Sequence, residues 1–446
     1  MNRFHDRRQF LKSAAVAVAS PWIVPRSVFG GAAPSERIRV ACIGTGNQGI
    51  AILRKFLANE DAEVVAVCDV NRGSYGYKTD DQFLGREPGC REVDKFYAEK
   101  RGTGGRRGCT GYNDFREVLA RDDVDAVTVV VPDQWHALMT IRAAEAGKDI
   151  YCEKPLSLTI GQGRAMVEAV RKHERILQTG SHERSNPQTR HICELVRNGR
   201  LGRLKRVITN VGYNNKEGPG PGWQPMPVPD GFDYDMWLGP APRVPYHKDR
   251  CLYRFRFNYD YSGGQVTNYG AHSNDLAQWG LGMDESGPVE IEFIDAKWLP
   301  KGSLFDTALE TRFLCRYASG AELLCQTAEP SVKVRFEGTE GMVEWGYSRV
   351  YRSEPESLIR SQIGPSELHL YQSDDHVRNF LDCVKSRREP VAPAEVGHRS
   401  ATVCHLGNVA VRLGRNVKWD PAKETFPGDD EANAMLDRPM RSPWHL

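Results

Sequence analysis

The sequence lacks the cysteine patterns that mark disulfide frameworks and metal sites. It has eleven cysteines, an odd number, and none forms a CxxC pair or a Cys/His cluster with metal-ligand spacing. Cys42, Cys68 and Cys152 lie in or beside apolar runs typical of strands, where a thiol behaves as a small hydrophobic group. We therefore expect buried free thiols, and we predict no metal site.

The sequence also lacks a membrane-spanning run and a strong net charge. The apolar stretch from Ala14 to Ala19 is far shorter than the roughly 20 residues that a span needs. The formal charge is +2, and it falls to −2 without residues 1–33, which hold five cations and one anion. This balance gives no electrostatic reason to expect a nucleic-acid or anionic-membrane partner. The basic residues at 100–107 stand among glycines and are interpreted as a solvated loop.

Residues 1–33 have the order of an export signal. A charged region with Arg7-Arg8 comes first, then the apolar run, then small residues at 30–33. The paired arginines ahead of Phe10-Leu11-Lys12 resemble a twin-arginine signal. The alternative is a membrane anchor, for which the apolar run is short. The prediction is an exported, periplasmic or extracytoplasmic protein that is already folded when it leaves the cytoplasm.

A dinucleotide-binding pattern begins at residue 39. A short apolar strand at 39–43 is followed by Gly44-Thr45-Gly46-Asn47-Gln48-Gly49 and then by apolar residues at helical spacing. Gly44 permits the tight turn, Gly46 lets the backbone approach a pyrophosphate, and Gly49 allows close packing of helix and strand. The pyrophosphate would then lie on free N–H groups at a helix N-terminus, with Asn47 and Gln48 beside it.

An acidic residue completes the pattern. The strand at 63–68 ends at Asp69, which lies 20 residues beyond Gly49 and would accept hydrogen bonds from the ribose hydroxyls. Glycines alone are a weak signal, but strand, glycines, helix, strand and acid in this order are a strong one. A carboxylate repels a 2′-phosphate and so favours NAD. The nearby Arg72 could bind a 2′-phosphate, so NADP is retained as the alternative cofactor.

Alternating strands and helices continue to residue 179. Strands are predicted at 124–131, 149–152 and 176–179, and helices at 113–120, 137–146 and 163–173. This alternation predicts a parallel, doubly wound sheet. Residues 72–111 form a long insertion rich in glycine and charge, and the sequence does not indicate its role.

Two segments follow the carboxyl ends of predicted strands, where open parallel sheets bind ligands. These are Pro132 to His136 and Glu153-Lys154-Pro155, and we expect Pro132, His136 and Glu153 near the cofactor. Pro155 biases Lys154 toward an extended backbone that aims its side chain into the cleft. There its ammonium could stabilise a developing alkoxide. The alternative is a surface lysine paired with Glu153.

A histidine segment forms the second candidate for catalysis. Residues 263–275 lead into an apolar-faced helix and contain His272, which could remove a hydroxyl proton while hydride leaves the same carbon. Asn268 lies four residues earlier and would share its helical face. The alternative for His272 is a capping or packed side chain.

Together these segments resemble the Gfo/Idh/MocA family of oxidoreductases, over nearly all of the chain after the signal. The shared motifs are the glycine loop, residues 114–127, Glu153-Lys154-Pro155, the segment 263–275, and the late helices at 376–381 and 395–400. The resemblance implies a Rossmann domain over 36–181 and an α/β domain over 182–446 with a large, mostly antiparallel open sheet. That sheet usually forms the subunit interface, which implies a homodimer or homotetramer.

The second half of the sequence agrees with this architecture. Strands are predicted at 204–214, 289–298, 310–317, 321–327 and 332–337, with a hairpin turn at 317–320.

Substrate contacts are predicted at several positions. Arg184 and Asp275 are candidates, as is the loop 213–235, which resembles a segment across the cleft mouth. Arg254, Arg256, Tyr259 and Tyr261 combine donors with aromatic faces that suit hydroxylated rings, although a loop packed by its aromatics is the alternative.

One residue departs from the family pattern. The resemblance implies Lys154 and His272 as the catalytic pair, with an aspartate commonly found where this chain has Asn268. An amide can orient an imidazole but cannot take a proton or stabilise imidazolium as a carboxylate does.

The leading hypothesis is an NAD(P)-dependent oxidoreductase that moves hydride between a tightly bound nicotinamide cofactor and a sugar or polyol hydroxyl. The first alternative is a redox-neutral glycoside hydrolase or lyase that acts through a transient keto-sugar, because an exported enzyme would find little free NAD. The second is a non-catalytic sugar or dinucleotide sensor, against which the retention of Lys154 and His272 argues.

Overall fold

The computed structural model describes residues 36–101, 108–213 and 218–446. The predicted signal at 1–33 and most of the basic loop lie outside the described residues. Within them, no helix is long and apolar enough to cross a membrane. All eleven cysteines are free and nine are buried, with Cys90 and Cys109 half-buried, so the prediction of buried free thiols is confirmed.

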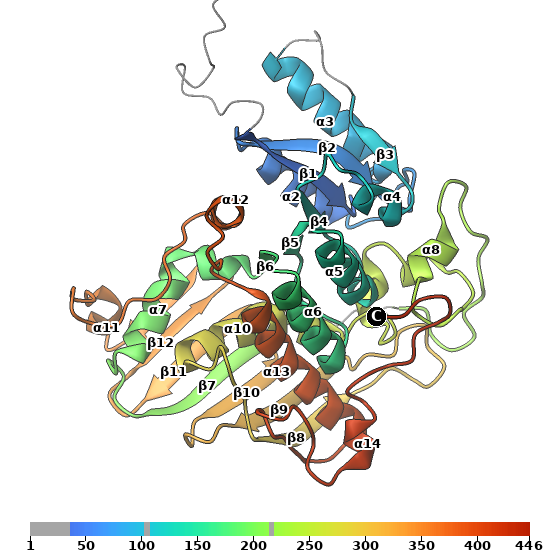
Figure 1. Cartoon of the computed structure of the whole chain (residues 1–446). Coiled ribbons are helices and arrows are strands. Elements are labelled where there is room, and N and C mark those ends of the chain that lie inside the picture. Colours follow the sequence, from blue (N-terminus) through green and yellow to red (C-terminus); the bar gives the residue numbers. More distant parts are fainter. Residues whose placement is uncertain (1–35, 102–107, 214–217) are drawn as a thin grey trace, which may run out of the picture. The chain divides into compact units, whose positions relative to one another are not determined.

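The first sheet has six strands, all parallel, in the order β3-β2-β1-β4-β5-β6 (Figure 1). The strands are β1 (Ile38–Ile43), β2 (Ala62–Cys68), β3 (Thr110–Tyr112), β4 (Ala126–Val129), β5 (Asp149–Cys152) and β6 (Leu177–Thr179). The helices between them include α2 (Asn47–Leu57), α4 (Phe115–Leu119), α5 (His136–Glu145) and α6 (Ile160–Lys172). The predicted doubly wound sheet is confirmed, and its strand order reverses between β1 and β4, where such sheets bind ligands.

The insertion at 72–111 supplies parts of this sheet that the sequence did not reveal. It contributes the edge strand β3 and the helix α3 (Arg86–Arg101). Helix α3 is mostly polar and packs through Cys90, Val93 and Tyr97, so its apolar periodicity is weak. The Tyr97 hydroxyl accepts a hydrogen bond from the backbone N–H of Val64 at 2.9 Å, which ties α3 to β2.

The second sheet has eight strands in the order β13-β12-β11-β7-β10-β9-β8-β14, and only β7 and β10 pair in parallel. Its strands are β7 (Leu204–Val211), β8 (Glu290–Lys297), β9 (Glu310–Arg316), β10 (Glu322–Thr327), β11 (Val332–Gly338), β12 (Met342–Gly346), β13 (Val350–Glu354) and β14 (Val417–Lys418). The large, mostly antiparallel sheet predicted above is confirmed. The hairpin at 317–320 is present, with Gly320 N donating to Tyr317 O at 2.9 Å.

Three helices pack on one face of this sheet: α7 (Pro187–Arg197), α10 (Gly270–Leu281) and α13 (Ala394–Leu413) (Figure 1). Leu276, Phe313, Phe336 and Leu406 are fully buried in the core between the helices and the strands. The other face carries ion pairs between strands, such as Arg206 with Glu322 at 2.7 Å.

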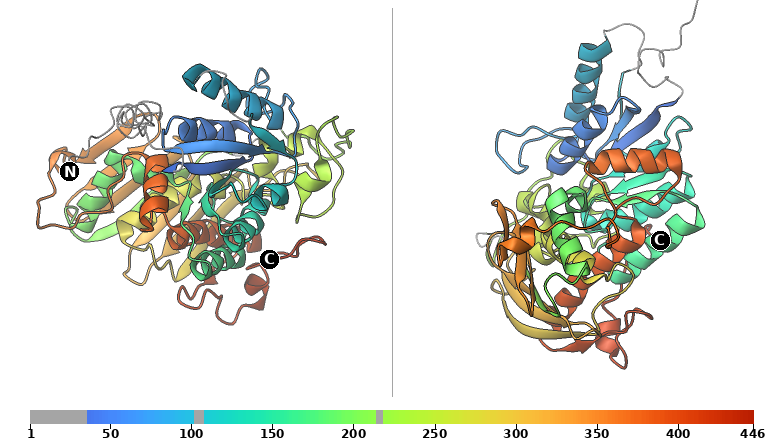
Figure 2. Two further views of the ribbon diagram at one scale, coloured as in Figure 1. Left: turned by 45° about the horizontal axis from the view of Figure 1, so that its top comes forward. Right: turned by 90° about the vertical axis from the view of Figure 1, so that its left-hand side faces the viewer.

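The C-terminal part of the chain returns to the first sheet. Helix α12 (His376–Ser386) lies beside strands of that sheet in Figure 2, and its Phe380 makes edge contacts with Phe56 and Tyr151 at centroid distances of 6.0 and 5.9 Å. Val377 and Leu381 join the same core. The late helices therefore stabilise the nucleotide-binding half as well as the larger sheet.

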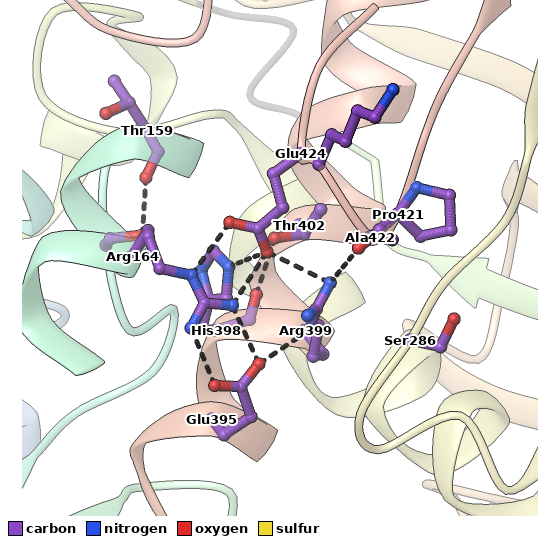
Figure 3. A network of polar contacts seen from close by, with 12 residues as sticks. Thr159, Arg164, Ser286, Glu395, His398, Arg399, Thr402, Pro421, Ala422 and Glu424 are labelled. Carbon is purple, nitrogen blue, oxygen red and sulfur yellow. Dashed lines mark hydrogen bonds and ion pairs between the residues drawn. The ribbon is translucent and has the colours of Figure 1, made fainter. Parts of the chain in front are cut away.

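A buried ion network joins α6 to α13 and to a late loop (Figure 3). Arg164 on α6 donates to Glu395 on α13 at 2.8 Å and to Glu424 at 2.9 Å. Arg399 contacts both carboxylates, and His398 bonds Glu424 at 2.6 Å. Burial raises the pKa of Glu395, but Arg164 and Arg399 outweigh it and lower this pKa to about 2.

We predict that Arg164→Met lowers the free energy of unfolding by about 2 kcal/mol at neutral pH, because the buried carboxylate of Glu395 and the half-buried carboxylate of Glu424 lose a cation. The native pKa of Glu395 is depressed, so its stabilisation is present above the unfolded pKa and is lost as pH falls toward about 2. The deficit measured by urea unfolding should therefore shrink below about pH 4.3. Arg360→Met, in the exposed pair with Glu356, is the control and should have little effect. A deficit independent of pH would contradict the prediction.

Candidate active site

The turn after β1 has no space for side chains. Gly44 has a φ of +88°, and a Cβ there would lie 2.0 Å from the carbonyl oxygen of Val130. A Cβ on Gly49 would lie 2.1 Å from the carbonyl oxygen of Gly44. Helix α2 begins at Asn47 without a side-chain cap, so its first N–H groups are available to an anion. This cradle fits the pyrophosphate of a dinucleotide.

A cavity of about 640 Å³ opens at this turn, a size typical of cofactor and substrate sites. Its lining joins the glycine turn, the segments after β4 and β5, and α9 (Gln265–Asn268) and α10 from the second half of the chain. Eleven predicted site residues line it: Gly44, Gly46, Asn47, Gln48, Gly49, Asp69, Pro132, Glu153, Lys154, Asn268 and His272.

Asp69 fixes the glycine turn to the end of β2. Its Oδ2 accepts hydrogen bonds from the backbone N–H of Thr45 at 2.7 Å and from the Thr45 hydroxyl at 3.1 Å. Its Oδ1 accepts from the backbone N–H of Asn71 at 2.8 Å. Burial raises the pKa of Asp69, and these hydrogen bonds oppose the rise. The carboxyl group also lines the cavity, where ribose hydroxyls would reach it.

Part of the 72–111 insertion covers the glycine turn. The ring of Tyr77 packs against Gly46, 3.0 Å from where a Cβ would stand, and its hydroxyl accepts from Nδ2 of Asn71 at 3.0 Å. The backbone N–H of Lys78 donates to Oδ1 of Asn47 at 3.1 Å, and Gln82 accepts from the Asn47 amide. A bound dinucleotide would therefore contact this loop or displace it.

Lys154 reaches from the end of β5 to the second half of the chain. Its Nζ donates to the carbonyl oxygen and to Oδ1 of Asn268, both at 3.1 Å. Glu153 instead accepts from Nε2 of Gln48 and from the backbone N–H of Lys154, both at 3.1 Å. Burial lowers the pKa of Lys154, Glu153 opposes this, and Arg256 adds to it. The ammonium is thus held in the cavity by an amide.

Asn268 is placed against Lys154 and not against His272. Its Nδ2 donates to Oε1 of Gln265 at 2.7 Å, so both of its polar atoms are engaged. Helix α9 ends at Asn268 and α10 begins at Gly270, so Asn268 and His272 belong to two separate helices. The predicted role of Asn268 in orienting His272 therefore has no counterpart in these contacts.

His272 is buried on α10 and lines the cavity. Its ring centroid lies 4.8 Å from that of His182 and 6.4 Å from that of Tyr347. Burial lowers the pKa of His272 well below its ordinary value, and Lys154, His182 and His376 lower it further. The imidazole is therefore neutral at neutral pH.

His136 lies outside the cavity lining. Its Nδ1 bonds the carbonyl oxygen of Pro155 at 2.8 Å and its Nε2 bonds that of Val131 at 2.9 Å. The ring thus fastens the segment after β4 to the segment after β5. It shapes the cavity rather than facing a cofactor.

The structure places Arg184 and Asp275 in a buried ion pair, away from the cavity. Nε of Arg184 donates to both carboxylate oxygens of Asp275 at 2.9 Å, and its guanidinium also binds Asp284 at 2.7 Å. The Arg184 and Asp275 side chains are each 1% exposed. They fix α10 to the segment after β6 and do not line the cavity, so we assign them a structural role in place of the predicted substrate contact.

Several cavity residues were missed by the sequence analysis. His182 lies three residues after the end of β6, so the rule that pointed to Lys154 would also have pointed to His182. Tyr347 follows β12, and no local signal connects it with the site. Of the four donors and aromatics proposed at 254–261, only Arg256 lines the cavity, whereas Tyr261 is buried against Trp237 at a centroid distance of 4.9 Å. Phe232 of the 213–235 loop also lines it.

No group of three or more His, Cys, Asp or Glu side chains within 36–101, 108–213 and 218–446 could hold a metal ion.

Comparison with protein families supports the assignment of the cavity as a dinucleotide-binding site. The model "Oxidoreductase family, C-terminal alpha/beta domain" matches residues 185–446, and "Oxidoreductase family, NAD-binding Rossmann fold" matches residues 91–181. The chain belongs to the Gfo/Idh/MocA oxidoreductase family. Its first sheet is accordingly the central sheet of an NAD-binding Rossmann domain, in agreement with the glycine cradle and Asp69.

Curated relatives of this Gfo/Idh/MocA protein match over parts of their length. "Uncharacterized oxidoreductase YrbE" of Bacillus subtilis is 40% identical over 90 residues, which is 20% of this chain and 26% of the relative. "Glycosyl hydrolase family 109 protein 1" of Shewanella sp. is 29% identical over 224 residues, and "Alpha-N-acetylgalactosaminidase" of Shewanella oneidensis is 28% identical over 224 residues. Each of these two matches spans 46% of this chain and 45% of the relative, so the chain covers less than half of either.

Solved structures share the fold along most of the chain. The aldose–aldose oxidoreductase of Caulobacter crescentus, complexed with glycerol, has a TM-score of 0.59 at 23% identity and covers 86% of this chain and 99% of its own. The WlbA dehydrogenase of Bordetella pertussis, in complex with NADH and UDP-GlcNAcA, has a TM-score of 0.59 at 18% identity and covers 86% of this chain and 99% of its own. A putative myo-inositol dehydrogenase of Sinorhizobium meliloti has a TM-score of 0.55 at 19% identity and covers 85% of this chain and 99% of its own.

We predict that Gly49→Ala weakens NADH binding by about 10- to 100-fold, because the new methyl group would lie 2.1 Å from the Gly44 carbonyl and must displace the turn. Titration of NADH fluorescence measures the affinity, and thermal unfolding monitored by circular dichroism shows whether the variant folds. Gly287→Ala is the control, because a Cβ there has no neighbour within 4 Å. Unchanged NADH affinity in a folded Gly49→Ala variant would refute the assigned cradle.

Proposed function

We propose that this protein transfers hydride between a nicotinamide cofactor and the hydroxyl-bearing carbon of a sugar or polyol. The observation that carries the proposal is the meeting of Lys154 and His272 in one cavity with the glycine turn of the NAD-binding domain. A bound NAD supplies the hydride acceptor. The sugar and polyol dehydrogenases among the structural neighbours support the substrate class.

The residues of the chain have separate tasks in this chemistry. The Lys154 ammonium is fixed by Asn268 and donates to the substrate oxygen, where it stabilises the developing alkoxide. The neutral His272 imidazole lines the same cavity and is a hydrogen-bonding partner for the hydroxyl. Phe232, Trp237 and Tyr253 add aromatic faces that can pack against a sugar ring.

A redox-neutral glycoside hydrolase or lyase is the second candidate. In this chemistry a sugar hydroxyl is oxidised, the neighbouring C–H becomes acidic, the leaving group is eliminated, and the hydride is returned. Two observations favour it: relatives named as glycosyl hydrolase family 109 proteins, and an amide at position 268. Both reactions would use the same cavity.

The proposal extends to the setting of the enzyme. The arrangement of residues 1–33 supports export by the twin-arginine route to the periplasm. The cofactor is proposed to be tightly bound, in contact with the loop that carries Tyr77 and Lys78. Association into a homodimer or homotetramer would use the open face of the second sheet.

One experiment separates the candidate functions. The purified full chain is incubated with NAD and a panel of glucose, galactose, N-acetylgalactosamine and myo-inositol, and separately with 4-nitrophenyl glycosides. Steady NADH accumulation, measured at 340 nm, supports the oxidoreductase. Release of 4-nitrophenol without net NADH supports the redox-neutral hydrolase. No turnover in either arm, with NADH binding intact, would contradict both the oxidoreductase and the hydrolase and would favour a sensor.

We predict that Lys154→Met lowers kcat for the most active substrate by about 10²- to 10³-fold, because the alkoxide loses its charged hydrogen-bond donor. NADH affinity should stay within about twofold, since Lys154 bonds Asn268 and not the glycine turn. Lys172→Met, at an exposed position on α6, is the matched control and should keep full activity. A Lys154→Met enzyme with normal kcat would exclude the assigned role.

We predict that replacing Arg7 and Arg8 together with lysine keeps the protein in the cytoplasm of an expressing bacterium. Cell fractionation and immunoblotting measure the distribution. The conservative change preserves charge, so a loss of export reports recognition of the arginine pair. Normal periplasmic accumulation of the double variant would contradict the twin-arginine route.

A further inference from the structure

His272 lacks a carboxylate that would support it as a proton acceptor. The side chain at position 268 is an amide, and its polar atoms are engaged by Lys154 and Gln265. Nδ1 of His272 is buried and has no hydrogen-bond partner among the residues that the structure describes. Burial and Lys154 lower the pKa of His272 well below its ordinary value. A proton placed on this ring would therefore be poorly stabilised.

A second imidazole with its own carboxylate lies beside His272. His182 begins the short helix η4 (His182–Ser185) after β6 and lines the cavity, with its ring centroid 4.8 Å from that of His272. Its Nε2 lies 3.2 Å from Oε1 of Glu183, whose side chain is only 9% exposed. Oε2 of Glu183 accepts a hydrogen bond from Nδ2 of Asn186 at 3.2 Å. The carboxylate is thus positioned by two neighbours.

We propose that His182, held by Glu183, is the catalytic group that takes the proton of the substrate hydroxyl. The inference rests on the proposed oxidoreductase function and names the base for it. Glu183, 3.2 Å from Nε2 of His182, would hold the proton of the ring on Nε2, which leaves Nδ1 of His182 as the acceptor. The carboxylate that is absent at position 268 is replaced by one from a different element of the fold.

The proposed step balances in atoms and electrons. The C–H bond of the hydroxyl-bearing carbon breaks and its hydride passes to NAD, while the O–H bond breaks and its proton passes to Nδ1 of His182. A C=O bond forms, the substrate loses two electrons, and NAD gains them. Glu183 stays ionised and stabilises the imidazolium of His182, as a carboxylate does in a catalytic triad.

The titratable groups that face His182 come from its own element and from three others. Burial raises the pKa of Glu183, but its contacts with His182, Asn186 and the Tyr347 hydroxyl outweigh this, so the pKa is lowered. His376 on α12 bonds Ser185 and the Thr179 carbonyl, and burial lowers its pKa to about 3, so it is neutral. His272 on α10 is also neutral. Glu183 is therefore the charged group in direct contact with His182.

The test measures kcat/KM against pH for the full chain, with the most active sugar of the panel and NAD. His182→Ala is expected to lower kcat/KM by about 10²- to 10⁴-fold without changing NADH affinity, and added imidazole should restore part of the loss. Glu183→Gln is expected to lower kcat/KM and to move the acidic limb of the profile to lower pH, because the imidazolium loses its carboxylate. His369→Ala, at an exposed position, is the matched control and should behave as the unaltered chain.

The outcomes separate the two proposals. An active unaltered chain, with a His182→Ala variant that keeps its pH profile or gains nothing from imidazole, overturns the His182–Glu183 base and leaves the oxidoreductase in place. If Glu183→Gln leaves the acidic limb of the pH profile where it is, Glu183 does not support the proton acceptor, and the proposed His182–Glu183 pair is overturned. An unaltered chain that transfers no hydride to NAD from any sugar overturns the proposed function, and the base falls with it.

Discussion

The hydrogen bonds from Lys154 to Asn268 set the geometry of the whole site. Lys154 follows the fifth strand of the NAD-binding sheet, and Asn268 ends a helix of the second half of the chain. The ammonium is costly to bury unless its donors are satisfied, so it fixes the distance between these two segments. The glycine turn, the lysine and His272 can share one cavity only while that distance is kept.

The rest of the fold holds the two segments in place. Helix α12 packs Phe380 onto the first sheet, and α13 is joined to α6 through Arg164, Glu395 and Glu424. Arg184 binds Asp275 and so fixes α10 to the segment that follows β6. Each contact joins residues far apart in sequence, so the late helices act on the site without lining it.

The sequence was most informative where the backbone itself imposes the residue type. Gly44 and Gly49 could be assigned from the motif because a Cβ there would collide with backbone oxygens, as the structure shows, and the parallel, doubly wound sheet followed from the alternating pattern of strands and helices. It was least informative for polar side chains such as Arg184 and Asn268, whose partners are chosen by packing. An arginine that follows a strand can face a substrate or a buried aspartate, and the local sequence is the same in both cases.

The sequence by itself determined the doubly wound sheet, the dinucleotide cradle and the candidates Lys154 and His272, because these depend on periodicity, on glycine sterics and on short motifs. The second, open sheet was expected from the resemblance to the family, with which the predicted strands agreed. Only the tertiary structure decided which groups meet. It turned Asn268 toward Lys154, brought His182 and Glu183 beside His272, and placed Tyr347 from a distant strand next to them. The physical reason is that hydrogen-bond partners depend on distances of a few ångströms between segments that are far apart in the chain, such as Lys154 and Asn268, which are 114 residues apart.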